Sequence, residues 1–319
     1  MDRILITGGA GFIGSHVVRR LAEVFPHSKI DILDKMTYAA DGDNIADVLE
    51  RGKRRLIVGD VCDYALCFEL TQRADCVVHL AAESHVDNSF GNSLRFSQSN
   101  MLGTHTLLEA ARANKVSKFI HVSTDEVYGE TLSGHHTETD PLNPTNPYSA
   151  SKAGADMVAN AYIHSFAMPI VILRANNIFG IRQYPEKIIP RFIMLGLLKK
   201  KFTIHGNGAH RRRYLAAPDF AEGVIAVLSK GIPGEIYNVA SDEEYRNIEV
   251  RNMIASHLGI DAESNTVYVA DRPFNDSRYA VASGKLEALG WKRSRRLADE
   301  MAGIIDWYGR NVDRYEHLF

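Results

Sequence analysis

Cysteine is scarce in this chain. Only three cysteines occur, Cys62, Cys67 and Cys76, and their spacing matches no common zinc-binding pattern. We therefore expect no metal site. An odd and low number of cysteines also gives no disulfide framework, so reduced thiols in a cytoplasmic protein are the simplest interpretation.

Long hydrophobic runs and an excess of one charge are also absent. No apolar run reaches the roughly 20 residues that a membrane-spanning helix needs. The first residues, MDRILITGG, enter a strand-like pattern at once, so we expect no signal peptide. The net charge of −2 gives no basic field for nucleic acid, although the basic run His210–Tyr214 could still bind a phosphate. The sequence thus predicts a cytoplasmic protein with no nucleic-acid or membrane partner.

Short apolar runs and helical patterns alternate through the first half of the chain. The helical patterns cover Phe12–Phe25, Leu94–Asn114 and a segment that begins near Pro147. Buried runs that alternate with helices are typical of a parallel sheet covered on both sides. We therefore expect an α/β fold with a Rossmann-type doubly wound parallel sheet. Its expected strands are Arg3–Thr7, Ile30–Asp34, Arg54–Asp60, Asp75–Ala81, Lys118–Ser123 and Pro169–Ala175.

The pattern loosens after Asn176, where glycine, proline and arginine become frequent. We expect residues 1–175 to form the cofactor-binding domain and residues 176–319 to form mainly a smaller, interleaved substrate-binding part. Two segments near 215–240 should return to the main sheet, the helix Asp219–Lys230 and the strand Glu235–Ala240.

A glycine-rich loop, TGGAGFIG, follows the first expected strand directly and opens the first helix. Gly8, Gly11 and Gly14 give a spacing that permits a tight turn, close approach of the backbone to a pyrophosphate, and packing of helix against strand. The helix N-terminus would then face the phosphates. The position between a strand and a helix supports a dinucleotide site, in which Phe12 and Ile13 lie at the start of the helix.

Acidic and small residues follow the next expected strands. Asp34 ends the second strand, 20 residues after Gly14, where a carboxylate can bind an adenosine ribose and repel a 2′-phosphate. This favours NAD over NADP, although the adjacent Lys35 weakens the exclusion. Asp60 and Val61 are placed to meet the adenine, and a surface aspartate is the alternative for Asp60. The remaining expected cofactor contacts are Thr37, Leu80, Ala81 and Ala82.

Tyr148 and Lys152 lie four residues apart at the start of an expected helix, which puts both side chains on one face. A phenol has a pKa of about 10, too high for a base at neutral pH. A neighbouring ammonium and a positive nicotinamide ring would favour the phenolate. Thr124 ends the preceding strand, and two carboxylates, Asp125 and Glu126, follow it directly. An adjacent acidic pair is by itself either a solvated turn or an acid and a base.

Together these residues resemble the extended short-chain dehydrogenase/reductase family over essentially the whole chain. The resemblance implies that Thr124, Tyr148 and Lys152 form the catalytic set. Within that family the chain is similar to NDP-glucose 4,6-dehydratases that act on dTDP-glucose or UDP-glucose. The motifs that carry this similarity are LDKMTYA, HLAAESHVD, STDEVYG, PYSASK, YPEKIIP and DRPFNDSRY, in that order.

The resemblance implies a reaction in which two carboxylates are needed. Tyr148 takes the proton of the 4-hydroxyl while hydride leaves C4 for NAD. Glu126 then removes the C5 proton and Asp125 protonates the departing 6-hydroxyl, before hydride returns to C6. The product is an NDP-4-keto-6-deoxyglucose, the enzyme is a lyase of deoxysugar biosynthesis, and NAD stays bound between turnovers. A homodimer is implied too, paired through the helix after Asn92 and the helix that carries Tyr148.

The same resemblance implies that the second half holds the nucleotide. Arg212 and Arg278 suit a diphosphate because a guanidinium presents a planar fork of donors, although each could also be a surface arginine. Asn275 replaces a histidine of the bacterial dTDP-type pattern, so the base stays open between uracil and thymine, as does the 2-substituent of the sugar. The substrate residues implied are Ser84, His85, Asn177, Glu186, Lys187, Arg212, Asn247, Arg278 and Tyr279.

Two alternatives remain at this stage. One is a sister enzyme on the same scaffold, an NDP-sugar 4-epimerase or an NDP-glucuronate decarboxylase. Such enzymes also begin by oxidising C4, but they need no acidic pair to eliminate water. The other is a non-catalytic NAD-binding regulator, which would have no use for an intact Thr124, Tyr148 and Lys152 set.

Overall fold

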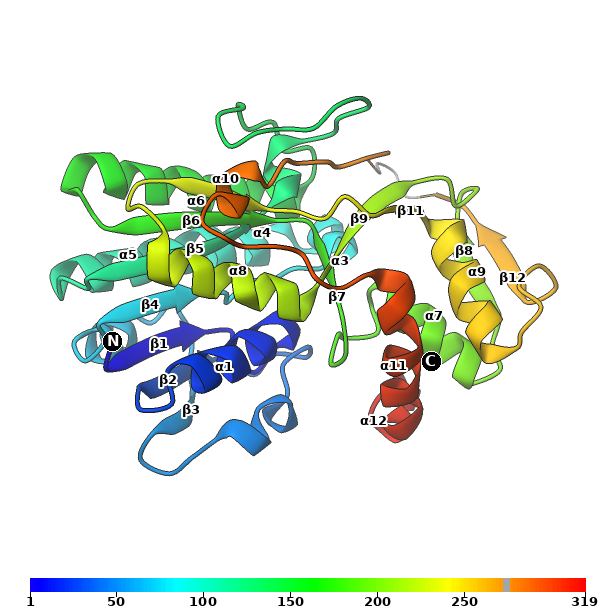
Figure 1. The fold of residues 1–319 in the computed structure, drawn as a ribbon, viewed down its shortest axis with the longest axis horizontal. Helices are drawn as coiled ribbons and strands as arrows, with labels where there is room; N and C mark the ends of the chain where they lie inside the picture. Colours follow the sequence, from blue (N-terminus) through cyan, green and yellow to red (C-terminus); the bar gives the residue numbers. More distant parts are fainter. Residues whose placement is uncertain (272–275) are drawn as a thin grey trace.

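The computed structural model describes residues 1–271 and 276–319. Its main sheet has seven strands in the order β10–β6–β5–β4–β1–β2–β3, and every neighbouring pair is parallel (Figure 1). This confirms the predicted doubly wound parallel sheet, including the late return of β10. The strands are β1 (Arg3–Thr7), β2 (Lys29–Asp34), β3 (Arg54–Val58), β4 (Cys76–His79), β5 (Lys118–Thr124), β6 (Ile170–Ala175) and β10 (Ile236–Val239).

Helices cover both faces of this sheet because its strands are apolar on both sides. In β1, Ile4 and Ile6 pack in one buried cluster and Leu5 packs in the other, as the alternation of a strand requires. On the first face lie α1 (Phe12–Val24) and α8 (Ala217–Lys230), which contact each other. On the second face lie α2 (Tyr64–Thr71), α5 (Gly103–Ala113) and α6 (Pro147–Phe166).

The long helix expected over Leu94–Asn114 is not uniform. It comprises α4 (Ser93–Phe96), a π-helical segment over Ser97–Leu102, and then α5. The π-helical segment contains Asn100, whose buried amide donates to the Glu83 carbonyl and to the Ser151 hydroxyl, both at 2.9 Å. π-helical insertions are frequent near functional sites. Here the inserted segment is linked by Asn100 to the segment that follows β4 and to α6.

A smaller part packs beside the carboxyl ends of the main strands, on the right in Figure 1. It has its own buried cluster, which includes Phe192, Phe202, Ile254 and Met301. Its three-stranded sheet has the order β11–β9–β7, and β8 and β12 form a separate parallel pair. Its elements are β7 (Asn177–Phe179), α7 (Ile188–Leu197), β8 (Phe202–His205), β9 (Arg211–Ala216), β11 (Glu244–Arg246), α9 (Asn247–Leu258), β12 (Thr266–Val269), α11 (Leu297–Arg310) and α12 (Val312–Tyr315).

Three further properties of the structure bear on function. No helix within the described ranges is both long and apolar enough to cross a membrane. Among the same residues, no three or more histidine, cysteine, aspartate or glutamate side chains are grouped so that they could hold a metal ion. Cys62, Cys67 and Cys76 are free thiols, and burial raises the pKa of each.

Candidate active site

One cavity of about 630 Å³ runs along the carboxyl ends of the main strands and continues beneath the smaller part. Ligands of open parallel sheets bind at this edge because the loops that follow the strands converge there. All the residues predicted to bind the cofactor line this cavity. They are Gly8, Gly11, Phe12, Ile13, Gly14, Asp34, Lys35, Thr37, Asp60, Val61, Leu80, Ala81, Ala82, Tyr148 and Lys152.

The glycine loop between β1 and α1 is packed against backbone on both sides. Gly8 has a φ of +72°, and a Cβ there would lie 2.7 Å from the backbone nitrogen of Ala81. A Cβ on Gly14 would lie 2.0 Å from the Gly8 carbonyl oxygen. These two glycines are therefore required for the turn and for the close packing of α1.

This packing predicts how two glycine-to-alanine substitutions change the stability of the fold. Gly14→Ala should lower the free energy of unfolding by about 1–3 kcal/mol, because the three atoms nearest to the new methyl group are backbone atoms, which cannot move away cheaply. Gly11→Ala is the matched control, since its Cβ would meet only the Gly8 carbonyl oxygen, at 3.4 Å. Urea unfolding of both variants without ligand measures the difference. Equal stability of the two variants would contradict this account of the loop.

Asp34 lies at the end of β2 and is buried. Its carboxylate accepts hydrogen bonds from the backbone N–H of Ala10 at 3.0 Å and of Met36 at 2.9 Å. Burial raises the pKa of Asp34 and the backbone hydrogen bonds oppose the rise. Lys35 turns away and forms an ion pair with Asp60 at 2.6 Å. Lys35 therefore does not pair with Asp34, whose carboxylate lies in the wall of the cavity.

The catalytic set lies where β5 ends beside the start of α6. The Lys152 ammonium donates to the Val122 carbonyl at 2.7 Å, and the Tyr148 ring meets Phe96 edge-on. Asn146 caps α6 by accepting from the Ser149 N–H at 2.8 Å. The same Asn146 donates its amide to the Glu126 carboxylate at 3.3 Å, so the helix start and the acidic pair are physically joined.

Burial shapes the ionisation of this set. It lowers the pKa of Lys152 to about 8, and Asp156 opposes that change. It raises the pKa of the Tyr148 phenol, with Glu126 adding to the rise and the Thr124 hydroxyl opposing it. The sequence predicted that Lys152 and a nicotinamide together would favour the phenolate. The protein groups alone act in the opposite direction, because burial disfavours the phenolate and the nearby carboxylates of Glu126 and Asp125 add to that effect.

The two adjacent carboxylates occupy different positions. Glu126 lines the cavity, whereas Asp125 lies behind Thr124 and Asn176, which do line it. The Asn176 amide donates to Asp125 at 2.7 Å. Burial and then the charge of Glu126 raise the pKa of Asp125 to about 7. Burial also raises the pKa of Glu126, but Lys187 and Arg212 oppose that rise, so the pair has separate environments.

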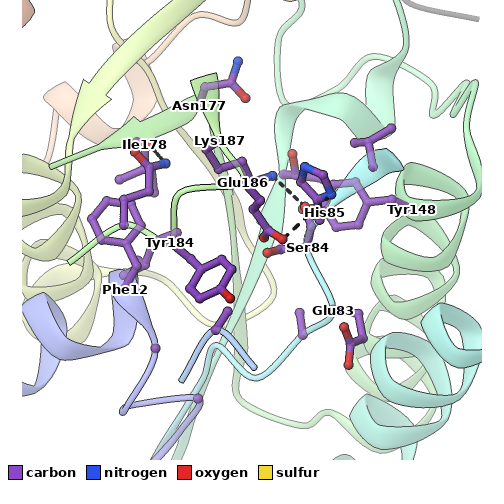
Figure 2. Close-up of a pocket in the computed structure, with 18 of the residues that line it drawn as sticks. Phe12, Glu83, Ser84, His85, Tyr148, Asn177, Ile178, Tyr184, Glu186 and Lys187 are labelled. Carbon is purple, nitrogen blue, oxygen red and sulfur yellow. Dashed lines mark hydrogen bonds and ion pairs between the residues drawn. The ribbon is translucent and has the colours of Figure 1, made fainter. Parts of the chain in front are cut away.

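Figure 2 shows how the two walls of the cavity meet. The Lys187 ammonium donates to the Ser84 carbonyl at 2.8 Å, and the Glu186 carboxylate lies 3.8 Å from the ring nitrogen of His85. Glu186 also accepts from the Tyr38 hydroxyl at 2.7 Å. The predicted substrate residues that line the cavity are Ser84, His85, Asn177, Glu186, Lys187, Arg212, Asn247 and Tyr279.

Arg278 does not join this set. Its guanidinium donates to Glu244 at 2.6 Å and to the Gly134 carbonyl at 3.0 Å, so its planar fork is occupied by protein groups. The expectation that Arg278 binds the diphosphate finds no support in this geometry. Asn275, on which the expectation about the base rested, lies outside the described residues.

Several polar residues of the site escaped the sequence reasoning, namely Tyr38, Asn146, Asn176 and Asp276. The only local signal was at Asn146, where an asparagine before a proline is typical of a helix N-cap. The others depend on contacts between segments that lie far apart in the sequence.

Known proteins resemble this chain along its whole length. A trifunctional UDP-glucose 4,6-dehydratase/UDP-4-keto-6-deoxy-D-glucose 3,5-epimerase/UDP-4-keto-L-rhamnose-reductase of Arabidopsis thaliana is 45% identical over 317 residues, which are 97% of this chain and 47% of the plant protein. The chain thus spans about half the length of such plant relatives. A dTDP-D-glucose 4,6-dehydratase of Mus musculus is 42% identical over 99% of this chain and 91% of its own.

Among solved structures, a dTDP-glucose 4,6-dehydratase of Streptomyces venezuelae with NAD and TYD bound has a TM-score of 0.96 and 40% identity. The match covers 99% of this chain and 100% of that one. With the glycine loop, the tyrosine–lysine pair and the parallel sheet, these likenesses define an extended short-chain dehydrogenase/reductase. More narrowly, the chain belongs to the GDP-mannose 4,6 dehydratase family, whose model matches residues 5–302.

Proposed function

We propose that this chain is an NAD-dependent lyase that dehydrates an NDP-glucose to an NDP-4-keto-6-deoxyglucose. One observation carries the proposal. Two adjacent buried carboxylates with separate environments lie beside Tyr148, and Asn146 links one of them to the helix that bears this tyrosine. Oxidation at C4 needs only the tyrosine and the lysine, whereas loss of water between C5 and C6 also needs a base and an acid.

The residues around the glycine loop fit NAD. The positions of Gly8 and Gly14 leave no room for side chains where the backbone must approach a pyrophosphate. Asp34 presents a buried carboxylate at the end of β2, which suits two ribose hydroxyls and repels a 2′-phosphate. Bound NAD would supply the hydride acceptor for C4 and the hydride donor for C6.

Each catalytic side chain has its own role in the proposed reaction. Tyr148 accepts the proton of the 4-hydroxyl, Thr124 positions that hydroxyl, and Lys152 fixes the orientation of the ribose next to it. Glu126 takes the C5 proton because its carboxylate lines the cavity and is oriented by the Asn146 amide. Asp125 donates its proton to the departing 6-hydroxyl. Since Asp125 lies behind Thr124 and Asn176, this role requires its carboxyl to turn toward the cavity when the sugar binds.

The pKa of Asp125 predicts how the dehydration rate depends on pH. An acid must hold its proton before the elimination, so the rate should fall as pH rises through about 7, the value to which burial and Glu126 raise this pKa. Asp125→Asn should lower kcat for dehydration by about 10²–10⁴-fold and remove this alkaline decline. Measuring kcat from about pH 6 to about pH 9, where a pKa near 7 is resolved, gives the profile. A wild-type rate that stays flat over this range would contradict the role of Asp125.

The smaller part supports the proposal for the nucleotide. Arg212 and Asn247 line the same cavity as the catalytic set, and Arg212 can pair with a diphosphate. The relatives include proteins named for UDP-glucose and for dTDP-glucose, so both nucleotides are candidates. In this arrangement residues 1–175, with the segments near 215–240, hold the cofactor, and residues 176–319 mainly hold the nucleotide sugar.

We infer a homodimer as well. Leu94 is 81% exposed and Met157 is 60% exposed, and both lie on the helices that the family resemblance assigns to the interface. Large apolar side chains exposed on neighbouring helices are a usual feature of a protein interface. No partner other than the nucleotide sugar and a second copy is proposed.

The alternative functions are compatible with the fold, but their chemistry does not account for the acidic pair. A 4-epimerase or a glucuronate decarboxylase shares the need for Tyr148 and Lys152, but has no use for a buried acid and base at the end of β5. A non-catalytic regulator would need neither the tyrosine–lysine pair nor the acid and base.

The test is to incubate the protein and NAD with dTDP-glucose, UDP-glucose and UDP-GlcNAc, and to analyse the products by mass spectrometry. The proposal expects loss of one water from at least one substrate. Intact masses throughout, or an isomer of unchanged mass, would contradict it.

A further inference from the structure

A carboxylate that the sequence reasoning did not single out lies in the wall of the cavity. Asp276 is 3% exposed and lines the cavity. The Thr145 hydroxyl donates to its Oδ2 at 2.6 Å, and the Tyr279 hydroxyl donates to the same oxygen. Two donors on one oxygen hold the carboxylate in a single orientation.

The other carboxylate oxygen of Asp276 is unpaired within the described part of the chain. Its Oδ1 is buried and has no hydrogen-bond partner among residues 1–271 and 276–319. Buried acceptors are nearly always paired in folded proteins, so an unpaired one in a cavity wall points to a donor supplied by a ligand. Because a carboxylate can only accept, that donor must be a hydroxyl or an N–H group.

The neighbours of Asp276 place it at the sugar end of the cavity. Thr145 precedes Asn146, whose amide donates to Glu126. The charge of Asp276 contributes to the raised pKa of Glu126. The cations that face this end are Lys187 and Arg212, and the Arg212 guanidinium lies over the Tyr279 ring at 4.9 Å. The unpaired oxygen therefore lies in the same part of the cavity wall as Glu126, which would meet C5 of the hexose.

We propose that Asp276 accepts a hydrogen bond from a non-reacting hydroxyl of the hexose, on C2 or C3, and so selects for sugars that carry it. This inference rests on the proposed function. The 4-hydroxyl is already assigned to Tyr148 and Thr124, and the 6-hydroxyl to Asp125, so only the 2- and 3-hydroxyls remain as donors. A site built to pair with a hydroxyl discriminates strongly against an analogue that lacks it, because its buried polar group is then unpaired.

The experiment compares the NDP-glucose that the wild type binds most tightly with its 2-deoxy and 3-deoxy analogues. One analogue should lose about 10–100-fold in kcat/KM, as expected for a hydrogen bond to a charged group. Asp276→Asn should show a similar loss with the parent sugar. Its amide oxygen would keep the Thr145 and Tyr279 hydrogen bonds and turn an NH₂ group toward the sugar. This variant should lose little more with the critical analogue, since the same contact is already gone.

Asp140→Asn is the matched control. Asp140 accepts from the ring of His136 at 2.8 Å and lies outside the cavity, so this variant should keep the wild-type discrimination. The analogues test the wild type directly, so the result does not depend on the folding of any variant. Calorimetric affinities for the three sugar nucleotides supply a readout that needs no turnover.

The outcomes separate the two proposals. If the wild type dehydrates the parent sugar and treats both deoxy analogues within about twofold of it, the role of Asp276 is wrong and the proposed function stands. If the wild type binds the parent about tenfold or more tightly than one analogue but dehydrates none, the proposed function is wrong and the role of Asp276 stands. If neither discrimination nor dehydration is seen, both are wrong.

Discussion

Replacing Glu126 with glutamine should abolish exchange of the C5 proton with solvent while oxidation at C4 continues. The substitution keeps the shape of the side chain and the contact with the Asn146 amide, but glutamine cannot accept a proton. Loss of a general base typically lowers a rate by about 10²–10⁴-fold, and product formation should fall by this factor. Deuterium incorporation at C5 in D₂O, followed by mass spectrometry, measures the exchange.

The fold should tolerate this substitution. Burial raises the pKa of Glu126, so the ionised carboxylate is disfavoured in the folded protein and a neutral amide relieves that cost. The thermal midpoint should therefore be equal to the wild type or higher. Glu69→Gln is a suitable control, because Glu69 lies on α2 outside the cavity and forms an ion pair with the exposed Arg73 at 3.4 Å. C5 exchange at the wild-type rate in Glu126→Gln would show that another group is the base.

Removing the phenolic oxygen of Tyr148 should stop the reaction one step earlier. Tyr148→Phe keeps the buried ring and its edge contact with Phe96, but it loses the group that accepts the 4-hydroxyl proton. We expect C4 oxidation to fall by about 10²–10⁴-fold. Exchange at C5 should fall with it, since the C5 hydrogen becomes acidic only beside a 4-ketone. The absorbance of reduced cofactor in a single turnover measures the oxidation.

A substrate that already carries the ketone distinguishes the two variants. Given an NDP-4-ketoglucose, Tyr148→Phe should exchange the C5 proton again, whereas Glu126→Gln should not. Tyr162→Phe is the matched control on the same helix, because the Tyr162 hydroxyl donates to Glu109 at 2.6 Å, away from the cavity. Failure of Tyr148→Phe to exchange the proton of the ketone substrate would contradict the separation of roles.

The parts of the site that could be predicted from the sequence depend on local geometry. Gly8, Gly11 and Gly14 are close in the chain, and their context between a strand and a helix leaves few possible structures. Tyr148 and Lys152 are one helical turn apart, so their shared face follows from the helix alone. The parallel sheet followed from the same kind of local pattern, because runs apolar on both faces must be covered by helices.

The parts that could not be predicted depend on pairing between distant segments. Nothing near Asp125 indicates that the Asn176 amide will donate to it, because this contact exists only once β5 and β6 lie side by side. Arg278 illustrates the reverse case. A guanidinium at this position suits a diphosphate as far as the sequence shows, but in the fold Arg278 donates to Glu244 of β11 at 2.6 Å. Asp276 could be recognised as a candidate site residue only from the structure, in which its Oδ1 is buried and, among the described residues, unpaired in the cavity wall.

The central claim is a redox-neutral dehydration within one active site, and an isotope label tests it most directly. The wild-type protein would be given NDP-glucose that carries deuterium at C4. The account predicts a product that has lost one water, bears a ketone at C4, and carries the same deuterium on C6. A product without deuterium at C6, or a sugar that keeps its 6-hydroxyl, would contradict it.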